Sequence, residues 1–418
     1  MNRNRLPAWV NRGIDSLADA PMSPLGRIAA RRLGTPAPTG SVATTEFADA
    51  TKRVLIAPVN YSGQGTAWAR ALEHADPSIS ARSMAVEVPG GFAFEADLVV
   101  PVGTYHNDPE WQRRQFEAAA SATHVLIEAE EPPFGRLLGR SVASQAAALR
   151  TRGVSVAYLA HGTDARLPSR HAASSPWSYY HDPSVYLPRA EALAARNIAL
   201  VEASDAPYFV STPDLLADLP GATWCPVVVD TDRWAVPRTP REAGAPLRVV
   251  HAPSNPVLKG TPLIMPALER LVAEGVITLE LVQGVPSAEM PAVFARADVL
   301  LDQFRLGSYG VAACEAMAAG CVVVGQISDQ VRGAVRERSG LELPIVEATP
   351  DSLEAVLREL ATGARPTTAS TAPAPFDALG PSSAEFVREL HDGRVSALAL
   401  QDAWISPRGE ELPDAPRS

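Results

Sequence analysis

The chain has 418 residues, of which 46% are hydrophobic and 20% charged, and these are ordinary values for a globular protein. Its 37 basic and 47 acidic residues give a net charge of −10, which argues against a nucleic-acid-binding protein. Three cysteines without zinc-ligand spacing exclude a disulfide framework and fit a reducing cytoplasm. No apolar run is long enough for a transmembrane helix, and the length suggests two domains.

Residues 1–50 are rich in Arg, Pro, Ser and Thr and predict a flexible leader. Within it, residues 24–33 fit a short basic amphipathic helix that contacts a membrane surface. The favoured interpretation is a mobile leader or a helix packed on the body, so a membrane contact is only the alternative.

Short apolar runs alternate with helical stretches from residue 51 to residue 228. This alternation predicts βαβ units and a mainly parallel sheet, so we assign the segment to one Rossmann-like domain. Helices are predicted most clearly at 110–120 and 137–152. Strands are predicted at 53–59, 83–88, 97–102, 123–129, 154–160, 208–212 and 223–229.

A stretch rich in Pro, Gly and charge at 229–246 predicts a hinge. The alternation resumes over 247–382, which we assign to a second α/β domain, and 383–418 should hold C-terminal helices and a tail. In two such domains the carboxyl ends of both sheets point into a cleft, where open parallel sheets bind ligands. Strands are predicted at 247–252, 278–284, 298–304, 321–327 and 344–348, and a surface loop at 364–375.

The strongest local signal is HAPSNPVLKGTPLIMPAL at 251–268, where a strand gives way to a helix. Lys259 and Gly260 open that helix, and the free backbone N–H groups of a helix N-terminus suit an anionic group. A lysine there adds a full charge and three donors for phosphate oxygens. Only Lys52 and Lys259 are lysines among the 37 basic residues. On this segment alone, a phosphate contact and a solvated loop lysine both remain open.

The second signal is DQFRLGSYGVAACEAMAAGCVVV at 302–324, which predicts a strand, a loop and a short helix that ends at Gly320. Glu315 lies in the Ala-rich, otherwise apolar helix, where a carboxylate is costly unless it meets a partner. The two hydroxyls of a ribose are one such partner. Pairing with an arginine such as Arg305, or exposure to solvent, is the alternative.

These stretches resemble, in order and spacing, the nucleotide-binding domain of the family 4 glycosyltransferases. The resemblance covers residues 208–330 well and the N-terminal half more loosely. It implies the GT-B fold, an α/β architecture of two Rossmann-like domains facing across a cleft, with the C-terminal helix packing back on the N-terminal domain. It also implies a retaining, metal-independent, hexosyltransferase-type reaction. The matching stretches are STPDLLADLPGATWCPVVVDTDRW, HAPSNPVLKGT, LELVQGVPSAEMPAVFARADVLLDQF and GSYGVAACEAMAAGCVVV.

The resemblance also implies roles for individual residues. Lys259 would bind the donor diphosphate, Glu315 the ribose hydroxyls, and His161, in YLAHGTDAR, would lie near the donor sugar. For His161, a core histidine is the alternative. The loop after the first strand would line the acceptor side through Gly63, Gln64 and Gly65. The full predicted donor set is Ser254, Asn255, Lys259, Gly260, Arg305, Gly307, Ser308, Tyr309, Gly310 and Glu315.

Two positions depart from the family pattern. Gly307 stands where the first Glu of the E-x7-E motif is expected, and Ser254 replaces an arginine that many members carry five residues before the lysine. Backbone N–H groups of 307–310, Arg305 or Asn255 are expected to supply these contacts instead. Gly307 and Gly310 allow the backbone to approach a ligand closely, or they are ordinary turn glycines.

Two acidic clusters carry weaker signals. Asp230 and Asp232 match the DxD metal motif of a different transferase fold, but they lie in the hinge, where a linker turn is favoured. We predict no metal site, because His171 and His181 have no companion spacing for a metal, and no cofactor, because the nucleotide sugar is a co-substrate. Glu128, Glu130 and Glu131 end a predicted strand, and they either meet an acceptor or form a solvated loop.

The sequence therefore predicts a cytoplasmic glycosyltransferase, soluble or membrane-peripheral, with a UDP- or GDP-linked donor, an unidentified acceptor and no nucleic-acid partner. One alternative is a non-catalytic GT-B protein that binds a sugar nucleotide or a glycan, motivated by Gly307 and Ser254. Another is a GT-B sugar-nucleotide epimerase. An epimerase would need acid/base carboxylates, and only the cluster at 128–131 offers any.

Overall fold

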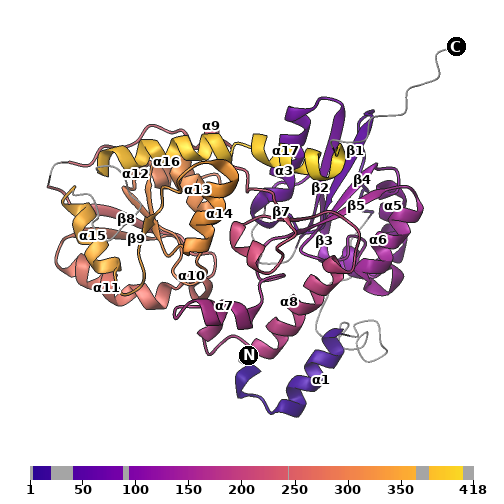
Figure 1. Ribbon diagram of the computed structural model, residues 1–418, viewed down its shortest axis with the longest axis horizontal. Coiled ribbons are helices and arrows are strands. Elements are labelled where there is room, and N and C mark those ends of the chain that lie inside the picture. The colour runs from indigo at the N-terminus through magenta and orange to yellow at the C-terminus, as the bar shows by residue number, and fades with distance from the viewer. Residues whose placement is uncertain (1–2, 20–40, 88–93, 243, 364–375, 408–418) are drawn as a thin grey trace.

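The computed structural model describes residues 3–19, 41–87, 94–242, 244–363 and 376–407. Figure 1 shows two α/β halves side by side, the N-terminal one in purple and the C-terminal one mainly in orange. Each half contains one sheet, and every strand pairing in both sheets is parallel. The predicted fold class, two Rossmann-like units in tandem, is confirmed.

The sheet of the N-terminal half has seven strands in the order β3-β2-β1-β4-β5-β6-β7. Its order reverses between β1 and β4, because the chain adds strands to one side of β1 and then to the other. The strands are β1 (Lys52–Ala57), β2 (Ile79–Glu87), β3 (Leu98–Pro101), β4 (His124–Glu128), β5 (Ser155–Ala160), β6 (Tyr208–Val210) and β7 (Thr223–Trp224).

The sheet of the C-terminal half has five strands in the order β12-β11-β10-β8-β9, so its order reverses between β8 and β10. Ligands of open parallel sheets bind outside the carboxyl ends of the strands at such a reversal. The strands are β8 (Leu247–His251), β9 (Ile277–Leu281), β10 (Val299–Leu301), β11 (Val322–Gly325) and β12 (Val346–Glu347).

Helices connect the strands and cover the sheets. Those before the hinge are α1 (Ala8–Asp19), α3 (Gln64–Ala75), α4 (Val102–Asn107), α5 (Pro109–Ala119), α6 (Val142–Thr151), α7 (Pro168–Ser174) and α8 (Leu187–Glu202). The later ones are α9 (Thr231–Trp234), α10 (Pro256–Lys259), α11 (Thr261–Ala273), α12 (Met290–Arg296), α13 (Val311–Ala318), α14 (Asp329–Ser339), α15 (Leu353–Ala361), α16 (Phe376–Leu390) and α17 (Arg394–Leu400). Short 3-10 turns are η1 (Arg3–Arg5), η2 (Tyr61–Gly63), η3 (Leu137–Arg140), η4 (Tyr179–His181) and η5 (Pro213–Ala217), and a π-helical turn, η6 (Gln401–Ile405), follows α17.

The central strands are buried on both faces, as their unbroken apolar runs require. Val54, Leu55 and Ile56 of β1 are consecutive and all fully buried. Val54 and Ile56 pack in one hydrophobic cluster and Leu55 in another, because successive side chains point to opposite faces of a strand. Burying such side chains contributes roughly 1.5–3 kcal/mol each relative to exposure.

The end of the chain returns to the N-terminal half. α16 lies along the C-terminal half and α17 packs on α3, with Leu400 and Trp404 in the same cluster as Val54 (Figure 1). The chain passes between the halves twice, once near Val229 and once near His391, and we call these two places the chain crossings. The backbone N–H of Val229 donates to the carbonyl of His391 at 2.8 Å, so the two chain crossings are bonded to each other. The predicted packing of the C-terminal helix on the N-terminal domain is confirmed.

Several predicted elements differ in extent. The strand predicted at 223–229 keeps two paired residues, because Pro226 lacks the N–H group that would continue the ladder. The helix predicted at 137–152 is interrupted by left-handed backbone at Leu138 and Gly139, and α6 starts after the N-cap Ser141. Helix α8 was not assigned individually from the sequence.

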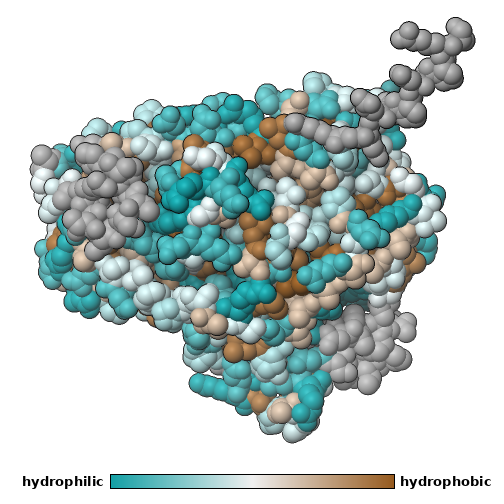
Figure 2. Space-filling model, viewed as in Figure 1, coloured by the Kyte–Doolittle hydropathy of each residue, from teal (hydrophilic) through white to brown (hydrophobic). Residues whose placement is uncertain are grey.

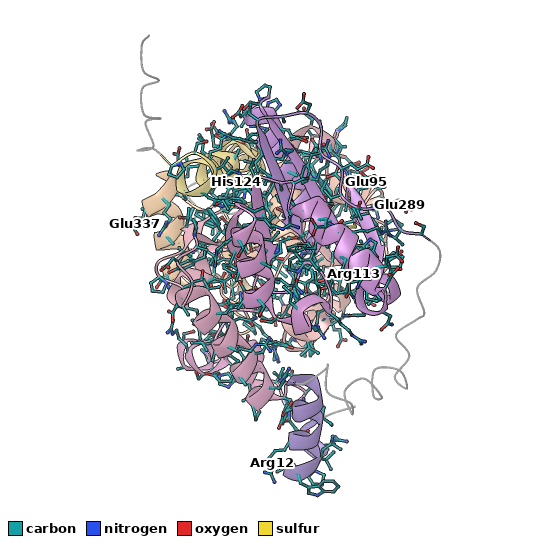
Figure 3. The ribbon with its side chains drawn as sticks, turned by 90° about the vertical axis from the view of Figure 1, so that its right-hand side faces the viewer. Arg12, Glu95, Arg113, His124, Glu289 and Glu337 are labelled. Carbon is teal, nitrogen blue, oxygen red and sulfur yellow. The ribbon has the colours of Figure 1, made fainter. Side chains whose placement is uncertain are left out.

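Part of the segment predicted as a leader packs on the body. Gln115 of α5 accepts a hydrogen bond from the backbone N–H of Thr45 at 2.9 Å, and Thr45 is buried. α1 stands outside both sheets, with Arg12 on its surface (Figures 1 and 3). Asn4, just before α1, donates to the carbonyl of Pro183 at 2.7 Å. The basic helix predicted at 24–33 and the loop at 364–375 lie outside the described residues.

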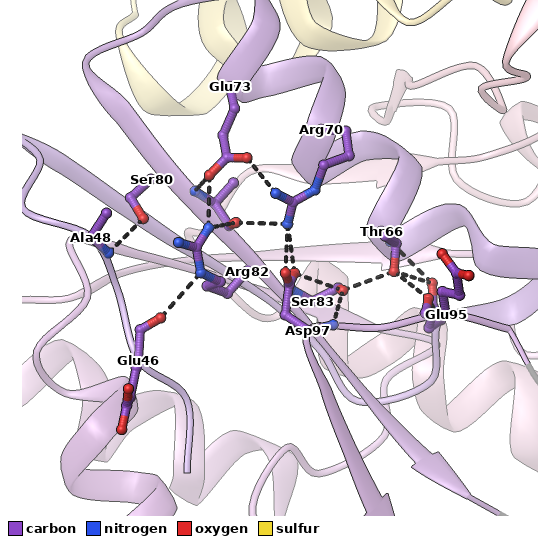
Figure 4. A network of polar contacts seen from close by, with 12 residues as sticks. Glu46, Ala48, Thr66, Arg70, Glu73, Ser80, Arg82, Ser83, Glu95 and Asp97 are labelled. Atoms are coloured by element: carbon purple, nitrogen blue, oxygen red, sulfur yellow. Dashed lines mark hydrogen bonds and ion pairs between the residues drawn. The ribbon is translucent and has the colours of Figure 1, made fainter. Parts of the chain in front are cut away.

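An ionic network fixes α3 on β2 and at the start of β3 (Figure 4). Arg70 contacts Asp97 at 2.7 Å and Glu73 contacts Arg82 at 2.7 Å. Asp97 also accepts the backbone N–H of Ser83 at 2.8 Å. The network holds the helix whose first turn carries the glycine-rich loop of the site.

The surface is mainly polar on the face drawn in Figure 2, where hydrophobic residues form small groups rather than one continuous patch. Among the described helices, none combines the length and the apolar character needed to cross a membrane.

Candidate functional site

The predicted site residues gather where the strand order of each sheet reverses. In the N-terminal half they lie within the segments 60–65, 128–131 and 161–164, at or after the ends of β1, β4 and β5, a region called here the N-half edge. In the C-terminal half they lie within the segments 252–261 and 302–315, after β8 and β10, a region called here the C-half edge.

Lys259 lies at the C-half edge, at the junction of α10 and α11. Asn255 caps α10 by accepting hydrogen bonds from the next N–H groups, and Gly260, with φ 81°, ends α10 and begins α11. The Nζ atom of Lys259 lies 2.5 Å from Oδ1 of Asp302, the first residue after β10. Both side chains are largely buried, and Oδ2 of Asp302 has no partner among the described residues.

His251 fixes the geometry of this junction. Its Nδ1 lies 2.8 Å from the carbonyl of Leu301, so it donates there, and its Nε2 accepts from the Thr261 hydroxyl at 2.7 Å. Burial lowers the pKa of His251, in agreement with a neutral ring that donates on one side and accepts on the other. The ring therefore links β8, β10 and the first residue of α11.

The loop before α13 presents backbone rather than side chains. Gly307 has φ 67°, which favours glycine, and a Cβ there would lie 3.4 Å from Cβ of Ser328. No described residue accepts a hydrogen bond from the backbone N–H of Ser308, Tyr309 or Gly310. The loop therefore offers several donors to an anionic or hydroxyl-rich group.

The side chain of Tyr309, which was predicted to bind the donor, is buried and faces His391 instead. It is 2% exposed, and its hydroxyl lies 3.2 Å from Nε2 of His391. Nδ1 of His391 donates to the carbonyl of Val227 at 2.8 Å, so Nε2 accepts from Tyr309. Tyr309 thus connects the loop to the chain crossings, and only its backbone remains a candidate for donor contact.

Glu315 lies in α13, which packs on α9. Burial raises the pKa of its carboxyl group to about 7, although the Arg233 guanidinium works in the opposite direction. No described residue donates a hydrogen bond to that carboxyl group. It titrates near neutral pH and is open to an external hydrogen-bond donor.

Arg305, in the C-terminal half, forms an ion pair with a residue of the N-terminal half. Its Nη1 lies 2.9 Å from Oδ2 of Asp182, and both side chains are mostly buried. The neighbouring carbonyl of Leu306 accepts from Nε2 of His171 at 3.1 Å. Loops that follow the carboxyl ends of both sheets therefore meet here, and the alternative in which Arg305 pairs with Glu315 is wrong.

Glu128 and His161 form the centre of the N-half edge. Oε1 of Glu128, at the end of β4, lies 3.0 Å from Nε2 of His161, the residue after β5. Oε2 of Glu128 accepts from the backbone N–H of Asn60 at 3.1 Å and of Val59 at 3.3 Å. Glu128 is fully buried, so the solvated-loop interpretation is wrong for this residue.

The glycine-rich loop packs tightly against this pair. A Cβ at Gly65 would lie 3.2 Å from Oε2 of Glu128, which explains a glycine at that position. The Gln64 amide is bonded at both ends to the backbone of Val228, at 2.7 and 3.0 Å. Its side chain is therefore bonded to Val228, the residue just before the hinge, and the acceptor-side prediction rests on the backbone of Gly63 and Gly65.

A second group of acids surrounds His161. Asp164 accepts from the backbone N–H of His161 at 2.8 Å and of Gly162 at 2.5 Å. Glu130 is 4% exposed, so it is not solvated, and burial followed by the nearby Asp164 carboxylate raises its pKa well above the usual value. The exposed Tyr61 ring packs edge-on against His161, with centroids 5.2 Å apart. Apart from Glu131, which faces Arg140 at 3.7 Å, the acids named here have no Arg or Lys partner among the described residues.

The remaining candidates either have a structural role or form no described hydrogen bond with the other site residues. Asp230 caps α9, as its side chain accepts from the N–H groups of Asp232 and Arg233, which fits the predicted linker turn. Ser254 is exposed and belongs to no described bond. A cavity of about 780 Å³ opens at the opposite end of the C-terminal sheet, and none of the predicted site residues lines it.

Sequence reasoning missed four residues of the two edges. Asp302 follows an apolar strand directly, and this signal could have marked it. Asn60, Tyr61 and Asp182 carry no such signal, because their importance depends on strand order and on contacts between the halves.

No protein-family model matches the chain, and no curated protein matches it by sequence. Among solved structures, sucrose-phosphate synthase from Thermosynechococcus elongatus is 13% identical, with a TM-score of 0.50 over 84% of this chain and 98% of that one. WaaG, a glycosyltransferase involved in lipopolysaccharide biosynthesis, is 13% identical, with a TM-score of 0.48 over 84% and 98%. A UDP-N-acetylglucosamine 2-epimerase is 10% identical, with a TM-score of 0.45 over 84% and 95%. At these identities the likeness concerns the fold, and the fold of this chain is the GT-B fold of glycosyltransferases.

Proposed function

We propose that this protein is a glycosyltransferase of the family 4 type that moves a sugar from a UDP- or GDP-linked donor to an acceptor hydroxyl. The observation that carries the proposal is Lys259 at the strand-order reversal of the C-terminal sheet, beside the start of α11 and a loop of unused backbone donors. A diphosphate needs this combination of a cation and N–H groups.

The leaving diphosphate gains negative charge as the bond from the anomeric carbon to its oxygen breaks. Lys259 and the N–H groups of Ser308 and Gly310 would stabilise that charge, because fixed donors need no reorganisation during the reaction. The acceptor oxygen bonds to the anomeric carbon on the face that the diphosphate leaves, and its proton passes to a diphosphate oxygen. This front-face route retains configuration without a protein nucleophile.

Lys259 would have to exchange Asp302 for the diphosphate, or bind both. Glu315 would accept hydrogen bonds from the ribose hydroxyls. The N–H groups of the loop would replace the side chain that Gly307 lacks, which supports transfer over the non-catalytic alternative.

The test is to incubate the protein with UDP- and GDP-sugars, alone and with candidate acceptors or extracts, and to measure nucleotide release. Release that depends on an acceptor, persists in EDTA and gives a product with the anomeric configuration of the donor agrees with a retaining, metal-independent transferase. Tight donor binding without release across the panel would favour the non-catalytic alternative.

A sugar-nucleotide epimerase is the second candidate, favoured by one observation. Glu128, His161, Glu130 and Asp164 bring acid and base groups together at the N-half edge. An epimerase converts UDP-N-acetylglucosamine without any acceptor. A changed sugar in the NMR spectrum of a donor-only incubation would therefore decide for this alternative.

A further inference from the structure

His161 has one ring nitrogen committed to a protein partner and one without. Its Nε2 faces Oε1 of Glu128 at 3.0 Å, and no described residue bonds its Nδ1. The Glu128 side chain is fully buried and that of His161 is 8% exposed. The contact is therefore shielded from water.

The hydrogen bonds around Glu128 determine its orientation. Its Oε2 accepts from the N–H groups of Asn60 and Val59, which leaves Oε1 for His161. A carboxylate can only accept hydrogen bonds, so the proton of a neutral His161 must sit on Nε2. Nδ1 then carries the lone pair.

Aromatic neighbours hold the ring in this orientation. Tyr61 packs edge-on against it with centroids 5.2 Å apart, and Trp68 lies tilted at 5.6 Å. The backbone N–H of His161 is bonded to Asp164 at 2.8 Å. Because backbone, ring plane and Nε2 are all fixed, the direction of Nδ1 is fixed as well.

We propose that Glu128 is a positioning residue, which keeps the proton of His161 on Nε2 so that Nδ1 accepts a hydrogen bond from a substrate hydroxyl. The identity of that substrate rests on the proposed glycosyl transfer, whereas the state of the ring does not. An accepting imidazole selects a hydroxyl that donates, and it thereby orients the oxygen lone pairs of that hydroxyl.

The substitution Glu128→Gln tests this directly, because glutamine keeps the size of the side chain. Its single carbonyl oxygen must accept from Asn60 and Val59, so its NH2 group faces Nε2 of His161. That nitrogen must then accept, and the proton moves to Nδ1. The variant thus keeps its hydrogen bonds and inverts the tautomer.

The primary readout is ¹⁵N NMR of labelled histidine, recorded above the usual histidine pKa of about 6.5. The His161 signals are assigned by their loss in His161→Gln. We expect Nε2–H in the wild type and in Glu128→Asp, and Nδ1–H in Glu128→Gln. A wild-type ring protonated on Nδ1, or an unchanged tautomer in Glu128→Gln, overturns the proposal whether or not the protein transfers sugars.

Turnover supplies the second readout. We expect Glu128→Gln to lower kcat about tenfold, the effect of one misdirected hydrogen bond, with partial recovery in Glu128→Asp. Glu337→Gln, on the surface of α14, is the matched control and should behave as wild type (Figure 3). An inverted tautomer with wild-type kcat and wild-type KM would overturn the role of Nδ1 in substrate binding. Absent turnover in every variant, the wild type included, would contradict only the proposed function.

Discussion

The two edges of the site differ in how the polar groups at their centres are bonded within the protein. At the N-half edge, Glu128 and Gln64 accept or donate at both ends of their side chains. At the C-half edge, Lys259 has a single carboxylate partner with one unpartnered oxygen, and Glu315 has no described hydrogen-bond donor. Buried polar groups are normally paired, so a ligand would complete these central groups of the C-half edge, whereas at the N-half edge it is Glu130 that keeps both carboxyl oxygens unpartnered among the described residues.

The edges also differ in charge. The N-half edge gathers the acidic groups of Glu128, Glu130 and Asp164, which have no Arg or Lys partner among the described residues, whereas at the C-half edge Lys259 balances Asp302 beside the N-terminus of α11. A diphosphate is therefore repelled more strongly by the first edge than by the second. We infer that the positioning groups belong to the N-terminal half and the anion-binding groups to the C-terminal half.

The largest effect is expected for Lys259→Ala. Loss of the charge that faces the donor diphosphate should lower turnover about 100-fold or more. Lys52→Ala is the matched control, because the other lysine lies on β1 away from both edges and meets Asp76 at 3.7 Å. Nucleotide release under saturating donor measures both variants.

Lys259→Ala also leaves Asp302 buried without its cation, which can cost about 3–5 kcal/mol of unfolding free energy. The double variant Lys259→Ala/Asp302→Asn removes that charge and should recover stability in chemical denaturation. It should remain inactive. If the folded double variant turned over at the wild-type rate, the diphosphate role of Lys259 would be refuted.

The variant Glu315→Gln tests the carboxyl group of Glu315, the other C-half-edge group without a described hydrogen-bond donor, through the pH dependence of stability. The folded protein raises the pKa of Glu315 from 4.5 to about 7, so the folded state holds a proton that the unfolded chain has lost. The stabilisation linked to that proton is complete below about pH 4.5 and disappears as the pH rises through about 7. Glu315→Gln should therefore gain stability relative to the wild type between pH 5 and pH 8, on the order of 2–3 kcal/mol.

The same variant should bind nucleotide less tightly, since an amide accepts fewer ribose hydrogen bonds than a carboxylate. For the wild type, affinity for UDP or GDP should rise from pH 6 to pH 8 more than it does for Glu315→Gln. Calorimetric titrations at both pH values give the comparison. Parallel pH dependences in the two proteins would exclude Glu315 from the nucleotide site.

The sequence predicted the strands and their order along the chain, because buried parallel strands are short apolar runs such as those of β1 and β10. It also predicted that Lys259 and Glu315 bind one nucleotide-sugar donor, and this stays a prediction. It could not predict the pairing of Glu128 with His161 or of Lys259 with Asp302, since the two residues of these pairs are 33 and 43 positions apart in sequence and meet only because the strands before them are neighbours in the sheet. Tyr309 was assigned to the donor because a loop motif does not reveal which way its aromatic side chain turns.

The ion pair between Asp182 and Arg305 links the halves, and breaking it tests whether the edges act together. Burial pushes the pKa of Asp182 up, but hydrogen bonds from Ser184 and the Arg305 guanidinium outweigh it and leave the pKa lowered. Asp182→Asn should cost about 1–2 kcal/mol, and the exchange Asp182→Arg/Arg305→Asp should recover part of it. Denaturation of the single and double variants measures this coupling, and additive effects would show that the pair contributes nothing.

The smallest effects are expected in the loop 307–310, which presents backbone donors. Substitution of its two glycines should affect different quantities, stability at Gly307 and nucleotide binding at Gly310. Gly307 has φ 67°, in the left-handed region that an alanine adopts only with strain, so Gly307→Ala should cost about 1 kcal/mol of unfolding free energy. Gly310 has extended backbone, with φ −139°, and open space around its Cβ position, so Gly310→Ala should leave stability unchanged. If the loop approaches the donor as proposed, the added methyl group in Gly310→Ala should weaken UDP or GDP binding several-fold in a calorimetric titration. Unchanged binding in Gly310→Ala would remove this loop from the donor site, and Lys259 with the start of α11 would then have to account for anion binding alone.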